Sequence, residues 1–148
     1  MTTTTVSQTS TSIPAAPVGI ATAVVASALT TLFAHDWGEV MFMVPVILVA
    51  AGLVFGVVVP RALRKESAGG TALGLSIPAV LFTLPAFWTG LPLVLGAAGM
   101  LVGNAGRNDR SGGGKCIVAV VLGALAVLGY LAIYAYELSA GETGFLLD

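Results

Sequence analysis

The feature that most constrains this chain is a stretch of forty residues, 67–106, that contains no Asp, Glu, Lys, Arg or His. As one straight helix it would extend about 60 Å at 1.5 Å per residue, which is twice the roughly 30 Å hydrocarbon core of a bilayer. Its middle, residues 85–92, reads Pro-Ala-Phe-Trp-Thr-Gly-Leu-Pro, and the second proline suits the first turn of a new helix. The stretch therefore predicts a tight hairpin of two short spans, 71–87 and 91–105.

Three further apolar runs flank this stretch, and each approaches the ~20 residues that a helix needs to cross a bilayer. They cover residues 18–34, 40–60 and 116–136. Over the whole chain 57% of residues are hydrophobic and 9% are charged, against about 25% charged in an average soluble domain. A soluble protein of this size would expose much of that apolar surface to water. The sequence therefore predicts an all-α integral membrane helical bundle over residues 18–136, with about five transmembrane helices including the short central hairpin.

The two ends of the chain differ from the bundle in composition. Residues 1–17 are rich in Thr, Ser and Pro and contain no charged residue. Such a segment does not bury enough apolar area to offset its ordering entropy, so a disordered tail is predicted there. Residues 137–148 contain three carboxylates and no basic residue, and they are predicted to form a short acidic tail.

The basic residues give the predicted orientation. All six lie in two loops, residues 61–65 and 107–115, and cytoplasmic loops carry an excess of Lys and Arg. A hairpin places both loops on one side, so the N-terminal tail is predicted to be cytoplasmic and the C-terminal tail external. Aromatic rings are enriched at membrane interfaces, and this topology places four of them at the outer interface: Trp37, Trp88, Tyr134 and Tyr136.

Residues 69–130 contain a glycine-bearing apolar hairpin, a short basic glycine loop and a third helix with a Val-Leu-Gly step. The hairpin begins Gly-Gly-Thr-Ala-Leu-Gly-Leu, passes through Phe87 and Trp88, and continues Leu-Gly-Ala-Ala-Gly-Met-Leu-Val-Gly. The third helix carries Ala-Val-Val-Leu-Gly over residues 119–123. This pattern resembles a widespread group of small multi-spanning actinobacterial membrane proteins of unknown function. The resemblance implies a bacterial cytoplasmic (inner) membrane protein, and it carries over no activity and no functional residue.

Small residues recur at helical spacing on three of the predicted spans. Eight of them are predicted to pack helices: Gly52, Gly56, Gly96, Gly99, Gly103, Ala119, Gly123 and Ala126. Lipid supplies no hydrophobic force between helices, so close backbone approach over small residues is important for their association. Packing within one chain is the first interpretation of these faces, and self-association through one of them is the alternative.

His35, Asp36 and Glu39 form the densest set of ionisable side chains outside the loops. In a helical turn His35 and Glu39 would share a face at i, i+4, which makes the three residues candidate metal ligands. Zinc usually takes three or four ligands, so interfacial solvation is the competing interpretation. Ser-Gly-Gly-Gly-Lys over residues 111–115 lacks the first glycine and the Ser/Thr of a P-loop. No cofactor and no catalytic residue is therefore predicted.

Charge also restricts the classes of function. A net charge of −1 gives no electrostatic reason to expect nucleic acid as a partner. No charged residue lies within a predicted span, whereas intramembrane charges usually mark ion paths or chemistry. The sequence favours a non-catalytic membrane protein, either an accessory or scaffolding subunit or a homo-oligomer, whose partners are the lipid bilayer and other membrane subunits or itself. The first alternative is a pore or carrier for a small neutral solute, and the second is a membrane enzyme that uses the external His35–Glu39 patch.

Overall fold

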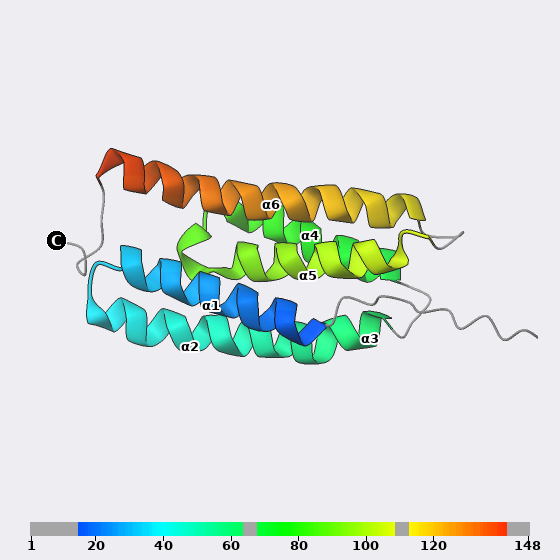
Figure 1. The fold of residues 1–148 in the computed structure, drawn as a ribbon, viewed down its shortest axis with the longest axis horizontal. Coiled ribbons are helices and arrows are strands. Elements are labelled where there is room, and N and C mark those ends of the chain that lie inside the picture. Colours follow the sequence, from blue (N-terminus) through cyan, green and yellow to red (C-terminus); the bar gives the residue numbers. More distant parts are fainter. Residues whose placement is uncertain (1–14, 64–67, 109–112, 142–148) are drawn as a thin grey trace, which may run out of the picture.

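The computed structural model describes residues 15–63, 68–108 and 113–141, and every regular element in these residues is helical (Figure 1). In chain order the elements are α1 (Ala15–Phe33), α2 (Trp37–Leu53), a π-helical turn η1 (Val54–Val58), α3 (Val59–Leu63), α4 (Ala68–Thr83), a 3-10 turn η2 (Phe87–Thr89), α5 (Leu91–Gly106) and α6 (Gly113–Ala140). The predicted all-α fold class is confirmed for the described residues.

Three of the described helices are long and apolar enough to cross a membrane. They are α1, the continuous helix Trp37–Leu63 that joins α2, η1 and α3, and α6, with 19, 27 and 28 residues. In the most apolar part of each, 28% of the residues are buried, so most of the apolar residues of these helices lie on the outside of the bundle. These three helices are compatible with an integral membrane protein.

The two helices of the central hairpin are shorter than the other three. α4 and α5 have 16 residues each, which corresponds to about 24 Å against a hydrocarbon core of roughly 30 Å. α4 ends at Thr83, four residues before the predicted end of that span. The physical reason is Pro85, which has no N–H to donate and disfavours helical geometry in the residue before it.

The outer helices extend beyond their predicted bounds. α1 begins at Ala15 rather than at residue 18, and Pro17 lies in its first turn, where a missing N–H has no cost. α6 begins at Gly113 and continues to Ala140, so it includes a glycine run that reads as linker in the sequence. The rest of the two predicted tails, residues 1–14 and 142–148, lies outside the described residues.

The π-helical turn in the second long helix has a local cause. Pro60 has no N–H, and its ring crowds the carbonyl group four residues earlier in an α-helix. The N–H of Val59, directly before this proline, donates to the carbonyl oxygen of Val54, five residues back. The wider turn keeps the helix continuous through the proline, in the way that single π-turns accommodate irregularities in α-helices.

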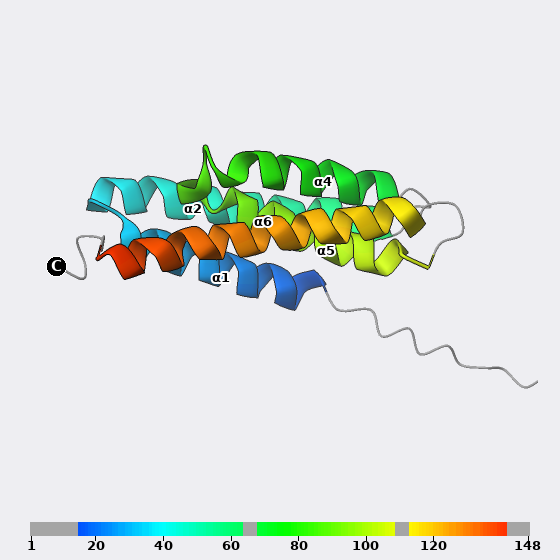
Figure 2. The ribbon, with the colours of Figure 1, turned by 90° about the horizontal axis from the view of Figure 1, so that it is seen from above.

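α1, the continuous helix Trp37–Leu63, α4, α5 and α6 run alternately in opposite directions along one bundle (Figures 1 and 2). The turn between α1 and α2, the turn between α4 and α5, and the C-terminal end of α6 are all directed toward one end, which we call the turn end. The C-terminal ends of α3 and α5 and the start of α6 lie at the other end, which we call the basic end because it carries Arg61, Arg107 and Lys115. The chain therefore folds back at the tryptophan turn; Lys65 lies outside the described residues.

The hairpin turns back before it reaches the level at which α1 and α6 end (Figures 1 and 2). η2 closes the turn, and Gly90 follows it with φ of +68°, a conformation that L side chains rarely adopt. Pro92 occupies the first turn of α5, as the sequence predicts. Because the hairpin is short at the turn end, the ends of α1 and α6 extend past η2, and Leu84 and Trp88 of the turn stay exposed on its outer side.

Candidate functional site

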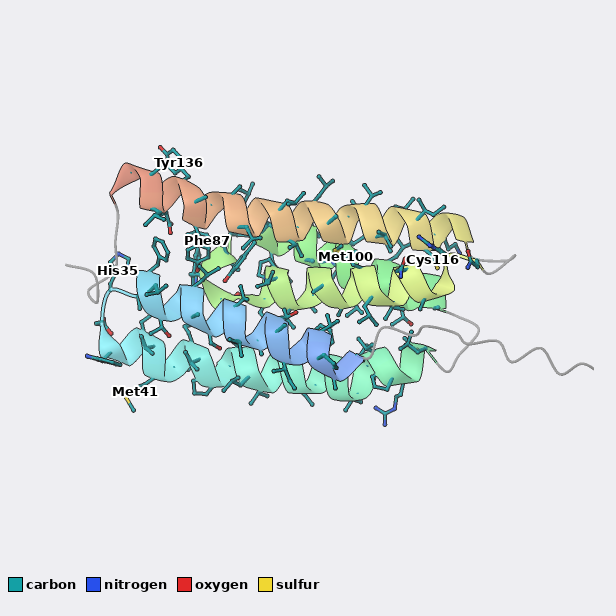
Figure 3. All side chains as sticks on the ribbon, viewed as in Figure 1. His35, Met41, Phe87, Met100, Cys116 and Tyr136 are labelled. Carbon is teal, nitrogen blue, oxygen red and sulfur yellow. The ribbon has the colours of Figure 1, made fainter. Side chains whose placement is uncertain are left out.

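A small pocket lies at the turn end of the bundle. It has a volume of about 110 Å³, and its lining residues come from α1, α2, the tryptophan turn, α6 and the loop before α2. They are Thr30, Phe33, His35, Glu39, Phe87, Trp88, Tyr134 and Glu137. Figure 3 shows His35 and Phe87 at this end of the molecule and Cys116 at the other. The pocket exists because the short hairpin leaves space between the ends of the longer helices.

The His35–Glu39 patch forms the start of α2. The Asp36 carboxylate accepts a hydrogen bond from the Glu39 N–H at 2.9 Å, and the Glu39 carboxylate accepts one from the His35 N–H at 3.0 Å. This reciprocal arrangement satisfies N–H groups that have no partner within the helix. The His35 Nδ1 lies 3.7 Å from Glu39 Oε2, with the imidazole 92% exposed and the Glu39 side chain 28% exposed.

The positions of His35, Asp36 and Glu39 can be compared with those that a metal site requires. The structure brings His35 and Glu39 together, whereas the Asp36 carboxylate is directed at the helix N-terminus as its cap. Within the described ranges, no three His, Cys, Asp or Glu side chains are grouped in a way that could hold a metal ion. These three residues therefore act together as a helix-capping unit whose Glu39 also lines the pocket.

Aromatic side chains from three separate segments pack beside this pocket. The ring centroids of Phe33 and Tyr134 are 4.9 Å apart, and those of Tyr130 and Tyr134 are 5.0 Å apart. Phe87 lies 5.8 Å from Tyr134 and 5.4 Å from Trp88, in edge-to-face arrangements. Such tilted pairs stabilise a cluster beyond the area that they bury, and they join α1, the tryptophan turn and α6 at the turn end.

Three hydroxyl groups lie together beside the pocket. The Tyr130 side chain is 0% exposed, and its hydroxyl lies beside those of Thr30 and Tyr134, both of which line the pocket. The Thr30 hydroxyl donates to the carbonyl oxygen of Trp88 at 3.4 Å. The polar part of the pocket wall is therefore backed by a buried tyrosine.

Most of the predicted packing residues meet inside the chain. A Cβ placed on Gly96 would lie 3.0 Å from the carbonyl oxygen of Gly123, and one on Gly123 would lie 2.6 Å from that of Gly96. A Cβ placed on Gly103 would lie 2.8 Å from the carbonyl oxygen of Cys116. Ala119 and Ala126 are buried on the same face of α6. These residues allow α5 and α6 to pack with their backbones in contact.

Gly99 lets α4 pack closely against α5. A Cβ at this position would overlap the side chain of Ser76 in α4. The Ser76 hydroxyl is fully buried and donates to the carbonyl oxygen of Ala119 at 2.8 Å. Because Gly99 leaves room for that serine, α4, α5 and α6 form one closely packed three-helix unit, against which α1 and α2 pack through α5.

Gly52 and Gly56 have a different environment, although their spacing is the same as that of Gly99 and Gly103. A Cβ at either position would meet no atom within 4 Å. Both glycines line a groove of about 310 Å³ between α1 and α2, which we call the α1–α2 groove, together with Ala16, Gly19 and Ala23 of α1. The structure therefore leaves this glycine pair facing outward on an apolar surface.

A larger groove of about 550 Å³ lies between α1 and α6, over α5. Twelve side chains line it, and only Thr22 and Asn104 are polar. The Thr22 hydroxyl donates to the carbonyl oxygen of Val18 in its own helix at 2.7 Å. This groove thus offers an apolar surface without the convergent polar groups that position a reacting substrate.

The sequence interpretation misses two features of the site. The first is the packing of Phe33, Phe87 and Tyr130 beside the pocket, because the aromatic pattern in the sequence indicates only positions at a membrane interface. The second is a further pair of outward-facing glycines, Gly70 and Gly74 of α4, whose Cβ atoms would also meet nothing within 4 Å. Their four-residue spacing is a signal in the sequence that would have found the second feature.

Comparisons with protein-family models, curated proteins and solved structures give no match for this chain.

Proposed function

We propose that this chain is a non-catalytic integral membrane protein that works as a subunit of a membrane assembly, and that its first partner is a second copy of itself. The observation that carries the proposal is the open Gly52/Gly56 face on the α1–α2 groove. Small-xxx-small faces let two membrane helices approach closely enough for extensive van der Waals contact. The glycines of α5 and α6 already serve this purpose inside the chain, and this pair does not.

A second copy fits this face because the interface would be self-complementary. In a two-fold dimer, the same patch is used on both subunits. The wall of the groove that faces Gly52 and Gly56 consists largely of small residues of α1, namely Ala16, Gly19 and Ala23. In such a dimer the small residues let four helices approach closely, as right-handed Gly-x-x-x-Gly crossings require. The exposed side chains of Ile20 and Leu48, which also line the groove, would pack around this contact.

The hydrogen bonds of the Ser and Thr hydroxyls favour a subunit of a membrane assembly over a carrier for a neutral solute. Thr22, Thr31 and Thr83 each donate to the carbonyl oxygen four residues earlier in their own helix. The Ser76 hydroxyl is used between α4 and α6. Hydroxyls that are bound to helix carbonyls satisfy the backbone rather than line a polar path, so few remain to replace the hydration of a passing solute.

We place the protein in a bacterial inner membrane with the basic end in the cytoplasm. The support is the position of Arg61, Arg107 and Lys115 at one end of the bundle, since cytoplasmic loops carry the excess of basic residues. In this orientation α1 starts and α5 ends on the cytoplasmic side, and the pocket at the turn end faces outward. The resemblance to actinobacterial membrane proteins is consistent with the location and remains part of the proposal.

The test is the oligomeric state of variants that fill the groove. Gly52→Leu and Gly56→Leu place a large side chain into the approach path of the partner, while the open space around both glycines lets the monomer fold. Native mass spectrometry of protein in mild detergent should show dimers for the natural sequence and mainly monomers for both variants. Gly74→Leu is the matched control, because it fills another open glycine position outside the groove.

Two outcomes for the natural chain and the groove variants would contradict the proposal, and one outcome for the control variant would count against it. One is a natural chain that is monomeric in every detergent and in nanodiscs. The other is a dimer that Gly52→Leu and Gly56→Leu leave intact. Equal dissociation by Gly74→Leu would also count against it, because the effect would then not belong to the α1–α2 groove.

A further inference from the structure

The pocket at the turn end has the size of a small molecule rather than of a single ion. Its volume of about 110 Å³ is room for about four water molecules at roughly 30 Å³ each. A trimethylammonium group has about the same number of non-hydrogen atoms. The walls are made by five segments that meet only in the folded protein, because the hairpin ends short of α1 and α6 (Figures 1 and 2).

The chemistry of the walls combines aromatic rings with carboxylates. Four of the eight lining residues are aromatic, and two are glutamates. Aromatic rings attract cations through their quadrupole, and this attraction is used to recognise quaternary ammonium groups. An inorganic cation such as Ca²⁺ instead takes six to eight oxygen ligands, which two carboxylates and a few hydroxyls do not provide.

The electrostatic field at the turn end also favours a cation. Asp36, Glu39 and Glu137 lie there, whereas every Lys and Arg of the described residues lies at the basic end. The Glu39 side chain is mostly withdrawn from water at 28% exposure, so its charge is screened less than that of a surface carboxylate. An anion would find no positive partner from Lys or Arg in this part of the described chain.

Hydroxyl oxygens add to this environment. Thr30 and Tyr134 line the pocket, and the buried Tyr130 side chain lies beside both of them. Hydroxyl oxygens carry lone pairs, which are a favourable neighbour for positive charge.

We infer that this pocket binds a small alkylammonium cation, with the aromatic side chains around the head group and Glu39 and Glu137 balancing its charge. The site does not depend on the proposed dimer, because it lies at the turn end and uses none of the residues of the α1–α2 groove. Free choline-like cations and the head groups of membrane lipids share this chemistry, and the experiment separates them.

Trp88 lines the pocket and can report on its occupancy. In a Trp37→Phe background Trp88 is the one tryptophan, and its fluorescence is followed in nanodiscs of phosphatidylglycerol during titration with choline chloride. We expect a saturable change that sodium chloride at the same ionic strength does not produce. The neutral isostere 3,3-dimethylbutan-1-ol, in which carbon replaces the nitrogen, should give no comparable saturation.

Two pairs of variants test which residues hold the cation. Glu137→Gln should weaken choline binding by about fivefold or more, because it removes a charge from the wall. Asp36→Asn removes a charge at the same end but outside the pocket, and Asn is an equally good helix cap, so binding should change less than twofold. Tyr134→Leu should abolish binding, whereas Tyr136→Leu, at a position that is 73% exposed, should leave it intact.

Nanodiscs that also contain phosphatidylcholine identify the source of the cation. Competition with soluble choline would assign the site to a lipid head group, and undiminished binding would assign it to a free cation. The inference is overturned if choline gives no saturable signal in phosphatidylglycerol alone, or if the neutral isostere binds as well as choline. It is also overturned if Asp36→Asn weakens binding as much as Glu137→Gln, since general surface charge would then explain the signal.

Discussion

Replacement of Gly123 by alanine is the perturbation whose effect the structure defines most closely. Gly123 and Gly96 mark the point at which the backbones of α6 and α5 cross. The new Cβ would lie 2.6 Å from the carbonyl oxygen of Gly96 and 2.7 Å from Cγ of Met100. The methionine side chain can move, but the carbonyl group belongs to a helix backbone and does not. To restore an ordinary contact of 3.4 Å, α6 must move outward by about 0.8 Å.

The expected loss in the free energy of unfolding follows from the contacts that this movement disturbs. Overpacking of a well-packed core costs about 1–3 kcal/mol. The same 0.8 Å shift would lengthen the hydrogen bond between Ser76 Oγ and the carbonyl oxygen of Ala119 from 2.8 Å to about 3.6 Å, which is no longer a hydrogen bond. Loss of such a bond between membrane helices costs about 0.6 kcal/mol on average. The higher helix propensity of alanine returns about 0.5–1 kcal/mol, so the expected net loss in the free energy of unfolding is about 1–3 kcal/mol.

The assay is reversible unfolding in mixtures of mild detergent and sodium dodecyl sulfate, followed by far-ultraviolet circular dichroism. Gly52→Ala is the matched control, because its Cβ would meet no atom within 4 Å; its unfolding free energy should be unchanged or rise by up to about 1 kcal/mol. The reasoning is refuted if Gly123→Ala is as stable as the natural chain. It is also refuted if the two variants lose the same free energy.

Two further substitutions test other parts of the fold by the same unfolding measurement. Ser76→Ala removes the hydroxyl that donates to Ala119 at 2.8 Å and should lower the free energy of unfolding by about 0.6–1.7 kcal/mol; an unchanged value would mean that this bond does not stabilise the three-helix unit. Gly90→Ala places a Cβ at a φ of +68° and 3.0–3.1 Å from side-chain atoms of Ile47 and Ala26, which should cost about 1–2 kcal/mol or more; a loss below 0.5 kcal/mol would show that the tryptophan turn does not require this conformation.

The hairpin was predictable because its signals are local. Two prolines and a glycine within residues 85–92, together with an uncharged stretch too long for one crossing, leave few other ways to fold. Helix ends were less predictable. The glycine run before Lys115 reads as a linker, yet the structure continues α6 to Gly113, since packing against neighbouring helices overrides weak local propensity.

Whether a glycine face is buried inside the bundle or exposed on its surface was not predictable from the spacing of the glycines alone. Gly52 and Gly56 have the same four-residue spacing as Gly99 and Gly103, but the first pair faces outward and the second is packed inside the bundle. The sequence shows that one face of a helix carries small side chains, whereas the arrangement of the neighbouring helices determines whether another helix covers that face. The rotation of each helix about its own axis is a property of the whole bundle.

The pocket was hidden from the sequence for a related reason. Phe33, Phe87 and Tyr134 belong to segments that are far apart along the chain, and they meet only when α1, the tryptophan turn and α6 reach the turn end together. The sequence does identify the His35–Glu39 patch, and the structure shows this patch as a helix cap that also forms one wall of the pocket. Helix capping leaves a clear local pattern, and a pocket formed by several segments does not.

The central claim is that the chain folds back at the tryptophan turn inside a membrane, so that both basic loops share one compartment. Cys116 is 1% exposed, so it is replaced by alanine and single cysteines are placed at three exposed sites: His35→Cys, Leu63→Cys and Asn108→Cys. An impermeant maleimide applied to intact cells should label the cysteine at residue 35 alone, and inverted vesicles should expose the other two. Labelling of residues 63 and 108 from opposite sides of the membrane would contradict the account.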